Sequence, residues 1–253
     1  MKPAIVVKLS GAALGADRPI RTAAFQQIAA QLETIQRLGH RVGVVVGGGN
    51  IYRGSETVNS GEFDDLLPEQ RDNLGMLATA LNAQGLVYAL QRRGLPVRLI
   101  ALPGVAAPLG QPWKKDDLAA TTDIVVVGGG TGVSGVSSDV AAPLLARDLG
   151  APLIIVSKHN VSGVYTSDPN IQRPGSPPAR FLEELTAQDA LDMGLLIMDR
   201  KALELCQEFG CIVRVVKAND GHSLLQAARG ERIGSTVRPA PQLAADLFVE
   251  AVV

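Results

Sequence analysis

Residues 124–139 read IVVVGGGTGVSGVSSD, and this stretch decides the fold that the sequence predicts. Four β-branched residues lead into a glycine-rich segment, and the aspartate at its end precedes the helix-like run VAAPLLARDLG. The order predicts a strand, a loop and a helix. Glycine lets a backbone approach a ligand closely, and serine or aspartate caps the free N–H groups at a helix start. Such a helix start attracts a phosphate group.

A second stretch, residues 41–54, repeats this pattern with RVGVVVGGGNIYRG. Here too a run of valines ends in consecutive glycines. In a parallel α/β sheet, ligands bind beyond the carboxyl ends of the strands, and both glycine loops are expected there. Two such junctions in one chain indicate a site for two phosphate-bearing groups, or for one long one.

Strand-like and helix-like segments alternate through the rest of the chain. Strands are predicted at residues 5–9, 42–46, 97–102, 124–127, 153–157 and 212–217, and helices at 22–38, 72–93, 187–193, 199–209 and 223–229. Continuous apolar strands indicate burial on both faces, hence an α/β fold: a three-layer αβα sandwich with a mainly parallel central sheet. Residues 104–120 are predicted to form a surface excursion. Met76, Leu77 and Leu81 are expected in the helix core.

The composition limits the class of protein. With 253 residues, of which 46% are apolar, the chain can build a full core. A net charge of −1 argues against nucleic acid or a membrane as the main partner, and the chain begins with a strand rather than a signal peptide, so a cytoplasmic location is expected. Cys206 and Cys211 are predicted to be reduced core thiols, and His40, His159 and His222 to be structural.

Several phosphate-binding folds use glycine-rich loops. Gly130, Gly132 and Gly135 match the dinucleotide fingerprint, but residues 153–158 (LIIVSK) lack the acid that should hold the ribose. The sequence has no Gly-Lys dipeptide, which excludes a P-loop. It also has no HExxH and no zinc-type Cys/His spacing, so no protein metal ligand is assigned.

Phosphoryl transfer between anions needs cations and N–H donors around the transferring group. Lys8 ends the first predicted strand within KLSG, so its side chain is expected to point into the ligand cleft. Simpler alternatives remain open for four residues: Lys8 as an ordinary strand-end lysine, Asp139 as a helix cap, Asp72 as a solvated helix residue and Tyr165 as a core residue.

Seven segments, in order, carry a resemblance to a known family. They are VKLSGAAL (7–14), GVVVGGGNIYRG (43–54), DNLGMLATALNA (72–83), GGGTGVSGVSSDVAAPL (128–144), GVYTSDP (163–169), LLIMDRKAL (195–203) and RGERIGSTV (229–237). Through them the chain resembles the amino acid kinase superfamily and, within it, the bacterial uridylate (UMP) kinases. GGGNIYRG followed by DxxGMLAT is the most specific pair, because it separates these kinases from their amino-acid-phosphorylating relatives.

The resemblance implies an activity and an organisation. It implies transfer of the γ-phosphoryl group of ATP to UMP, with Mg²⁺ as cofactor, to give UDP in pyrimidine nucleotide biosynthesis. It also implies one amino acid kinase-like domain over residues 1–237, with an acceptor-binding half at 1–150, an ATP-binding half at 151–237 and a tail at 238–253. The implied assembly is a homohexamer.

The resemblance further implies roles for individual residues. Lys8 and Asp139 would be catalytic, with Asp139 organising either Lys8 or magnesium, and Asp72 would accept hydrogen bonds from the ribose hydroxyls. The residues implied on the UMP side are Gly48, Gly49, Arg53, Asp72, Gly130, Thr131, Gly132, Ser137 and Ser138. Those implied on the ATP side are Ser10, Gly11, Ser157, Lys158, Asn160, Tyr165 and Asp168.

The ATP-side segment departs from the family pattern. Ser157 stands where the family has a lysine, and Ser162 stands where it has an acid. Lys158 follows one position along, but a one-residue shift in a strand turns a side chain to the opposite face. Lys217, at the end of another predicted strand, is a further candidate for the missing charge.

Other departures leave two alternative functions open. Ala12 replaces a glutamate, Val136 replaces a phenylalanine, and PWKKDDLAAT (112–121) replaces an arginine-containing helix. One alternative is a non-catalytic ATP-binding storage or regulatory protein. The other is a kinase of the same superfamily with another small acceptor, although Arg53 and Asp72 fit a nucleotide better.

Overall fold

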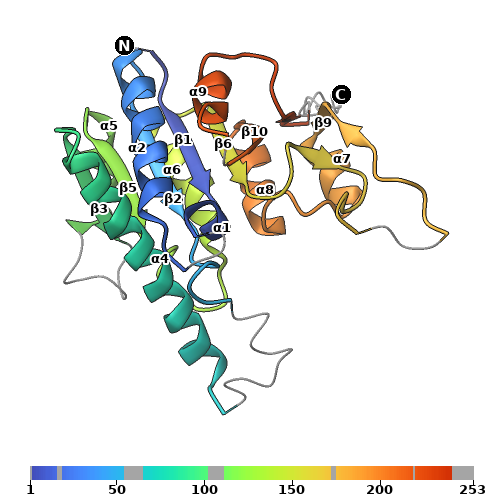
Figure 1. Ribbon diagram of the computed structural model, residues 1–253, viewed down its shortest axis with the longest axis horizontal. Coiled ribbons are helices and arrows are strands. Elements are labelled where there is room, and N and C mark those ends of the chain that lie inside the picture. Colours follow the sequence, from blue (N-terminus) through green and yellow to red (C-terminus); the bar gives the residue numbers. More distant parts are fainter. Residues whose placement is uncertain are drawn as a thin grey trace, which may run out of the picture.

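The computed structural model describes residues 2–15, 19–53, 65–101, 111–171, 175–218 and 220–240. At its centre lies a nine-stranded sheet in the order β4-β3-β5-β2-β1-β6-β10-β11-β9, while β7 and β8 form a separate pair (Figure 1). The strands are β1 (Ile5–Leu9), β2 (Val42–Val46), β3 (Val97–Ala101), β4 (Gln111–Pro112), β5 (Ile124–Gly128), β6 (Leu153–Lys158), β7 (Val164–Tyr165), β8 (Phe181–Leu182), β9 (Glu184–Thr186), β10 (Ile212–Lys217) and β11 (Ser235–Arg238).

The central strands pair in parallel, as their apolar runs predict. β1 lies between β2 and β6, and Lys8 is level with Val45 on one side and Val156 on the other. In the described part of the sheet, β10 with β11 is the one antiparallel pair. Parallel pairing places the carboxyl ends of β1, β2, β5 and β6 at one edge, so the glycine loops that follow them meet there.

Helices cover both faces of the sheet, which confirms the three-layer α/β architecture. They are α1 (Gly11–Leu14), α2 (Thr22–Arg37), α4 (Pro68–Gln91), α5 (Lys115–Ala119), the 3-10 helix η1 (Ser138–Val140), α6 (Ala141–Leu149), α7 (Ala187–Asp192), α8 (Arg200–Glu208) and α9 (Ser223–Ala228). One core packs α2, α4 and α9 against strand residues such as Val7, and the other packs α6 and α8 against residues such as Val6 (Figure 1). Neighbouring valines of β1 thus serve opposite cores.

The long helix differs from its prediction at its start. It begins at Pro68 rather than at residue 72, because proline suits the first helical position and the Gln70 side chain accepts a hydrogen bond from the Leu67 N–H at 2.8 Å. The expected core positions of its apolar residues are also partly wrong. Leu77 and Leu81 are 51% and 50% exposed, so that face of α4 is turned to solvent.

The surface excursion predicted at 104–120 is only partly wrong. Residues 114–117 are exposed, as predicted, but the segment contains β4 and α5. Leu118 is buried in the core, and the Trp113 indole N–H donates to the Asp148 carboxylate at 2.9 Å. A single tryptophan among prolines and glycines indicated a loop, whereas in the structure Trp113 packs against the hydrophobic core. Residues 102–110 of this excursion, and residues 54–64, lie outside the described residues.

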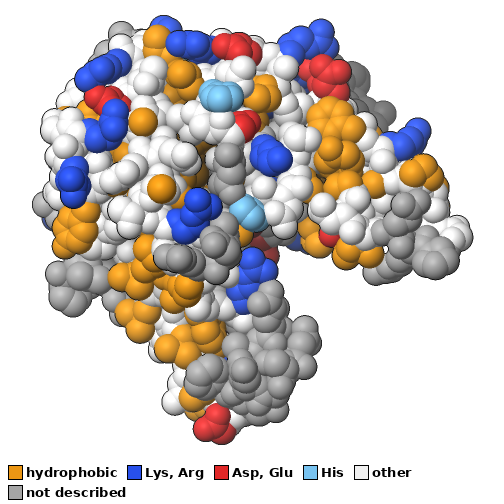
Figure 2. Space-filling model, viewed as in Figure 1, with side chains coloured by type: hydrophobic (Ala, Val, Ile, Leu, Met, Phe, Trp, Pro, Cys, Tyr) orange, Lys and Arg blue, Asp and Glu red, His pale blue; other side chains and the backbone are white. Residues whose placement is uncertain are grey.

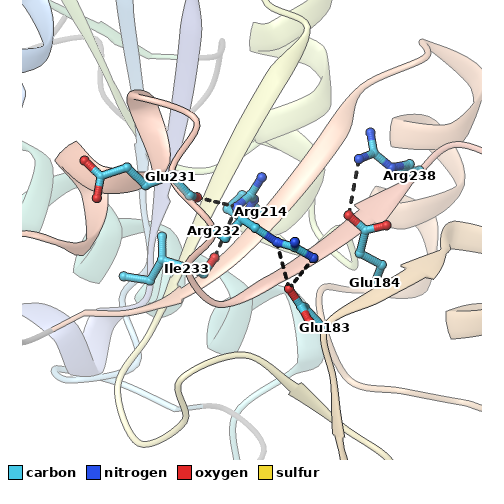
Figure 3. Close-up of polar contacts among 7 residues, drawn as sticks. All are labelled: Glu183, Glu184, Arg214, Glu231, Arg232, Ile233 and Arg238. Carbon is cyan, nitrogen blue, oxygen red and sulfur yellow. Dashed lines mark hydrogen bonds and ion pairs between the residues drawn. The ribbon is translucent and has the colours of Figure 1, made fainter.

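Five short strands, β4, β7, β8, β9 and β11, were not predicted. Each has two to four residues, too few for a recognisable alternation. Figure 3 shows charged side chains in and beside β9, β11 and β10: Arg232 pairs with Glu183 at 3.0 Å, and Arg238 pairs with Glu184 at 3.4 Å. Both pairs are largely exposed, so they contribute little to stability.

Two features of the fold bear on chemistry away from the glycine loops. Cys206 and Cys211 are buried free thiols, and burial raises the pKa of Cys211 to about 11 and that of Cys206 further. Such thiols are poor nucleophiles at neutral pH. Over the ranges that the structure describes, no helix has the length and apolar character to cross a membrane.

Candidate active site

Lys8, near the end of β1, and Asp139, in η1, form an ion pair at the edge of the sheet where the glycine loops meet. The Lys8 Nζ lies 2.7 Å from Asp139 Oδ1, and Lys8 is only 6% exposed. Asp139 Oδ2 accepts a hydrogen bond from the Asp199 backbone N–H at 3.0 Å. Burial opposes ionisation of Asp139, but Lys8 and these hydrogen bonds outweigh it and hold the pKa below its ordinary value. Asp139 is therefore an ionised partner that orients Lys8.

The helix-cap alternative for Asp139 is wrong. The cap of η1 is Ser137, whose Oγ accepts a hydrogen bond from the Asp139 N–H at 3.2 Å. Ser137 thus acts on the backbone of the element that carries Asp139. This contact leaves the Asp139 carboxylate available to Lys8 and to the start of α8.

Lys158, the last residue of β6, reaches the same region. Its Nζ donates to the Leu196 carbonyl at 3.3 Å, and its charge acts on both Asp139 and Lys8. Burial, with a smaller effect from Lys8, lowers the pKa of Lys158. Lys158 and Ser157 are neighbours in β6, so their side chains lie on opposite faces of the sheet. Lys8 is level with Val156, and therefore Lys158 lies on the same face as Lys8.

Backbone of the first two loops packs closely around Lys8. A Cβ on Gly11 would collide with the backbone nitrogens of Gly49 and Asn50. A Cβ on Gly47 would lie 2.9 Å from the Gly11 nitrogen and 3.6 Å from the Lys8 Nζ. Only glycine fits here, because the KLSG loop and the GGGN loop lie against each other.

Helix α4 fixes these loops through two polar residues that the sequence analysis missed. The fully buried Asn82 donates to the Gly47 carbonyl at 2.7 Å and exchanges hydrogen bonds with the Asn50 side chain. Thr79 accepts from the Gly129 N–H at 2.9 Å. The signal that could have found them is a polar residue on the buried face of a helix, since such groups need partners.

A cavity of about 270 Å³ opens between α4 and the two glycine loops. Seven of the residues predicted on the acceptor side line it: Gly48, Gly49, Arg53, Asp72, Gly130, Thr131 and Ser138. Gly132 and Ser137 are not among the residues that line it, although both belong to the adjoining loop. The Arg53 Nε donates to the Gly49 carbonyl at 2.6 Å, which holds the guanidinium beside the loop. The cavity thus combines backbone N–H groups, a cation and a carboxylate.

Asp72 is engaged with the second glycine loop rather than solvated. Its Oδ2 accepts hydrogen bonds from the Ser134 hydroxyl at 2.6 Å and from the Gly135 N–H at 2.7 Å. Gly135 has φ +75°, a conformation that favours glycine. Asp72 therefore holds the loop that closes one side of the cavity.

A second cavity, of about 470 Å³, is lined by residues of the later part of the chain, between Lys158 and Val215. Four of the residues predicted on the ATP side line it, namely Lys158, Asn160, Tyr165 and Asp168. His159, expected to be structural, also lies in its wall. Apolar residues of the loop before α8, such as Leu196, form the facing wall. Figure 2 shows the molecule hollowed between the projecting start of α4 and the lobe that contains β7 and β8.

The residues predicted on the ATP side differ in their contacts. Tyr165 is half-buried, with its ring edge-on to Phe181 at 5.3 Å and its hydroxyl 3.0 Å from the Ser162 hydroxyl. Asp168 accepts from the Asn170 N–H at 2.8 Å and shapes the turn. Ser10, Gly11 and Ser157 are not among the residues lining this cavity. Within the described chain, the Oγ atoms of Ser10 and Ser157 are buried without a hydrogen-bond partner.

The described residues offer magnesium little of its usual ligand set. No group of three or more His, Cys, Asp or Glu side chains in the described ranges is placed to hold a metal ion. Both Asp139 oxygens are already engaged, one by Lys8 and the other by the Asp199 N–H. The donor set instead fits an ion whose ligands come mostly from a bound triphosphate.

Known proteins of similar sequence and structure agree with this arrangement. The chain is 34% identical to the uridylate kinase of Pediococcus pentosaceus over 92% of its own length and 95% of that protein. It is 32% identical to the uridylate kinase of Thermotoga petrophila over 93% and 99% of the two chains.

The structural matches point the same way. A crystal structure of UMP kinase from Ureaplasma parvum superposes with a TM-score of 0.82 at 28% identity, covering 94% of this chain and all of the other. The UMP kinase of Bacillus anthracis gives a TM-score of 0.83 at 26% identity, covering 94% and 98%. Residues 3–217 also match the family described as the amino acid kinase family. The chain therefore belongs to the amino acid kinase family.

Proposed function

We propose that this protein is a UMP kinase, which transfers the γ-phosphoryl group of ATP to UMP. The observation that carries the proposal is the Lys8–Asp139 ion pair next to residues of both cavities. Asp139 follows Ser138, which lines the cavity beside Arg53 and Asp72. Asp139 also interacts electrostatically with Lys158, which lines the cavity beside Tyr165 and Asp168. Such an arrangement brings two phosphate-bearing ligands end to end. The uridylate kinase relatives, which match the chain over more than nine-tenths of its length, support the acceptor.

The reaction needs positioning and charge rather than a base. A phosphate oxygen of UMP forms a bond to the γ-phosphorus, and the bond from that phosphorus to the bridging oxygen of ADP breaks. The departing ADP keeps the electron pair. The acceptor oxygen is already deprotonated at neutral pH, so no proton must be removed. Lys8 stabilises charge on the transferring group, and Asp139, with its lowered pKa, stays ionised to orient Lys8.

The two cavities divide the binding work between them. On the acceptor side, Arg53 and the N–H groups of the loops at Gly48 and Gly130 would bind the UMP phosphate. On the donor side, Asn160, Tyr165 and Asp168 would bind the nucleoside of ATP. Mg²⁺ would enter with ATP, bound by the triphosphate oxygens, and would neutralise part of their charge.

The same proposal covers the organisation of the chain. Residues 1–237 would act as one domain, with acceptor binding in 1–150 and ATP binding in 151–237, followed by the tail 238–253. The acceptor cavity is lined by residues between 48 and 138, and the other cavity by residues between 158 and 215, which supports this division.

We propose a cytoplasmic homohexamer as the assembly. The half-exposed Leu77, Leu81 and Tyr88 form an apolar row on α4 that a second copy would cover, and hydrophobic side chains gather over this part of the surface in Figure 2. Sedimentation of the purified protein tests the assembly.

The test of function is ADP release from Mg-ATP with UMP, CMP, AMP, GMP, acetylglutamate and carbamate offered separately. Turnover with UMP alone is expected. ATP binding without turnover on any acceptor would instead favour a storage or regulatory protein. Turnover with a different acceptor would favour another kinase of the superfamily.

A further inference from the structure

Lys158 follows Ser157 at the end of β6. The family resemblance implies a lysine at position 157 and not at 158. The serine is 1% exposed and level with Leu9 of β1, on the face opposite to Lys8. Lys158 is level with the end of the neighbouring β10 and on the face that carries Lys8.

Three observations place the Lys158 ammonium group at the junction of the two ligands. Lys158 lines the donor cavity, and its charge acts on Asp139 and Lys8. Asp139 follows Ser138, which lines the acceptor cavity. The Leu196 carbonyl receives one Lys158 N–H at 3.3 Å, which anchors the side chain and leaves two N–H groups for a ligand.

Electrostatics explain why a second cation belongs here. Lys8 is already paired with Asp139, so the charge of that pair is largely balanced. A triphosphate meeting a nucleoside monophosphate concentrates several negative charges at one point. Without a further cation, repulsion between donor and acceptor would oppose their approach.

We propose that Lys158 binds the γ-phosphoryl group of ATP during its transfer. This inference rests on the proposed kinase function. Lys158 thereby stabilises charge on the transferring group from the donor side while Lys8 does so from β1. The bonds made and broken are those of the proposed reaction, and Lys158 keeps its proton throughout.

The test compares Lys158→Gln with Lys217→Gln. Lys217, the other candidate for the missing charge, is the matched control: it ends the neighbouring strand β10 level with Lys158, but it is exposed to solvent and is not among the residues lining either cavity. Two measurements are made on each variant: kcat with UMP, and the affinities for Mg-ATP and Mg-ADP. Lys158→Arg tests rescue by charge, and thermal unfolding verifies that each variant is folded.

Lys158→Gln is expected to reduce kcat about 10²-fold, the usual cost of losing one stabilising group in a transition state. It should weaken ATP binding about tenfold while ADP binding stays within about twofold, since only ATP has the γ-phosphate. Lys158→Arg should recover much of the loss, and Lys217→Gln should change neither quantity. A merely structural role for Lys158 would weaken ATP and ADP equally.

Moving the lysine supplies a second test. The double variant Ser157→Lys/Lys158→Ser should be no more active than Lys158→Ser, because position 157 faces the opposite core. Recovery of activity in the double variant would overturn the inference, as would an unchanged ATP-to-ADP affinity ratio in Lys158→Gln. If the wild-type protein binds ATP but phosphorylates no acceptor, the proposed kinase function is overturned instead. The ratio of the ATP and ADP affinities of Lys158→Gln would still show whether Lys158 contacts the γ-phosphate.

Discussion

Lys8 Nζ and Asp139 Oδ1 lie 2.7 Å apart, although one belongs to the first strand and the other to the helix start that follows the fifth. Parallel pairing of β1 with β2, and of β2 with β5, brings these positions to the same edge of the sheet. The Asp139 carboxylate also accepts from the Asp199 N–H, so three segments of the chain meet at this ion pair.

The ion pair should behave as one unit in kinetics. Lys8→Met is expected to lower kcat about 10²- to 10³-fold, because it removes a charge that stabilises the transferring group. Asp139→Asn should lower kcat by disordering Lys8. The double variant should lose little more than Lys8→Met alone, since both changes disable the same interaction. If the two single-variant losses in kcat, expressed as free energies, add up to the loss of the double variant, the two residues act independently.

The ion pair should also make the free energy of unfolding depend on pH in the acidic range. The pKa of Asp139 is lowered in the folded protein relative to its ordinary value of 3.8. The contribution of its ionised form is therefore present above pH 3.8 and is lost as the pH falls through the lowered folded value. We expect the stability advantage of the wild type over Asp139→Asn to shrink below that pH in urea unfolding. An advantage that stays constant from about pH 6 to pH 3 would contradict the linkage.

Asp72 should control acceptor binding through the loop that it holds. Asp72→Ala removes the acceptor for both Ser134 and Gly135, so the KM for UMP should rise about tenfold, the usual effect of losing hydrogen bonds to a charged group. Ser134→Ala keeps the bond from the Gly135 N–H, and its effect should be smaller. The KM for ATP, whose cavity lies elsewhere, serves as the internal control. Equal changes in both KM values would indicate general loosening of the fold.

Two glycines on the wall of the acceptor cavity should respond oppositely to alanine. In Gly48→Ala, the new Cβ would lie 2.9 Å from the Ala78 Cβ and from the Thr79 nitrogen, so α4 must shift and the protein should lose stability. Gly75 lies within α4, and the nearest atom to its Cβ would be 4.0 Å away. Gly75→Ala should therefore stabilise the protein by about 0.5–1 kcal/mol. Thermal unfolding of both variants tests this, and destabilisation by Gly75→Ala would refute the helix argument.

Local sequence was sufficient for the six longer strands of the sheet's centre and for the longer helices. β1, β2 and β10 have the predicted bounds, because runs of β-branched residues have few other stable arrangements. β7, β8, β9 and β11 could not be predicted, because their pairing depends on partners far along the chain. Trp113 gave the wrong signal for a similar reason: its partner, Asp148, lies on another element.

The candidate site divides in the same way. The residue types and the glycine spacing alone predicted phosphate sites after β2 and β5, because close backbone approach and helix-start capping are local properties. Tertiary structure decided which charges meet. It paired Lys8 with Asp139, engaged Asp72 with Ser134 and Gly135, and brought Lys158 to the face of Lys8. These relationships depend on strand register and on packing between helices, which no single stretch of sequence contains.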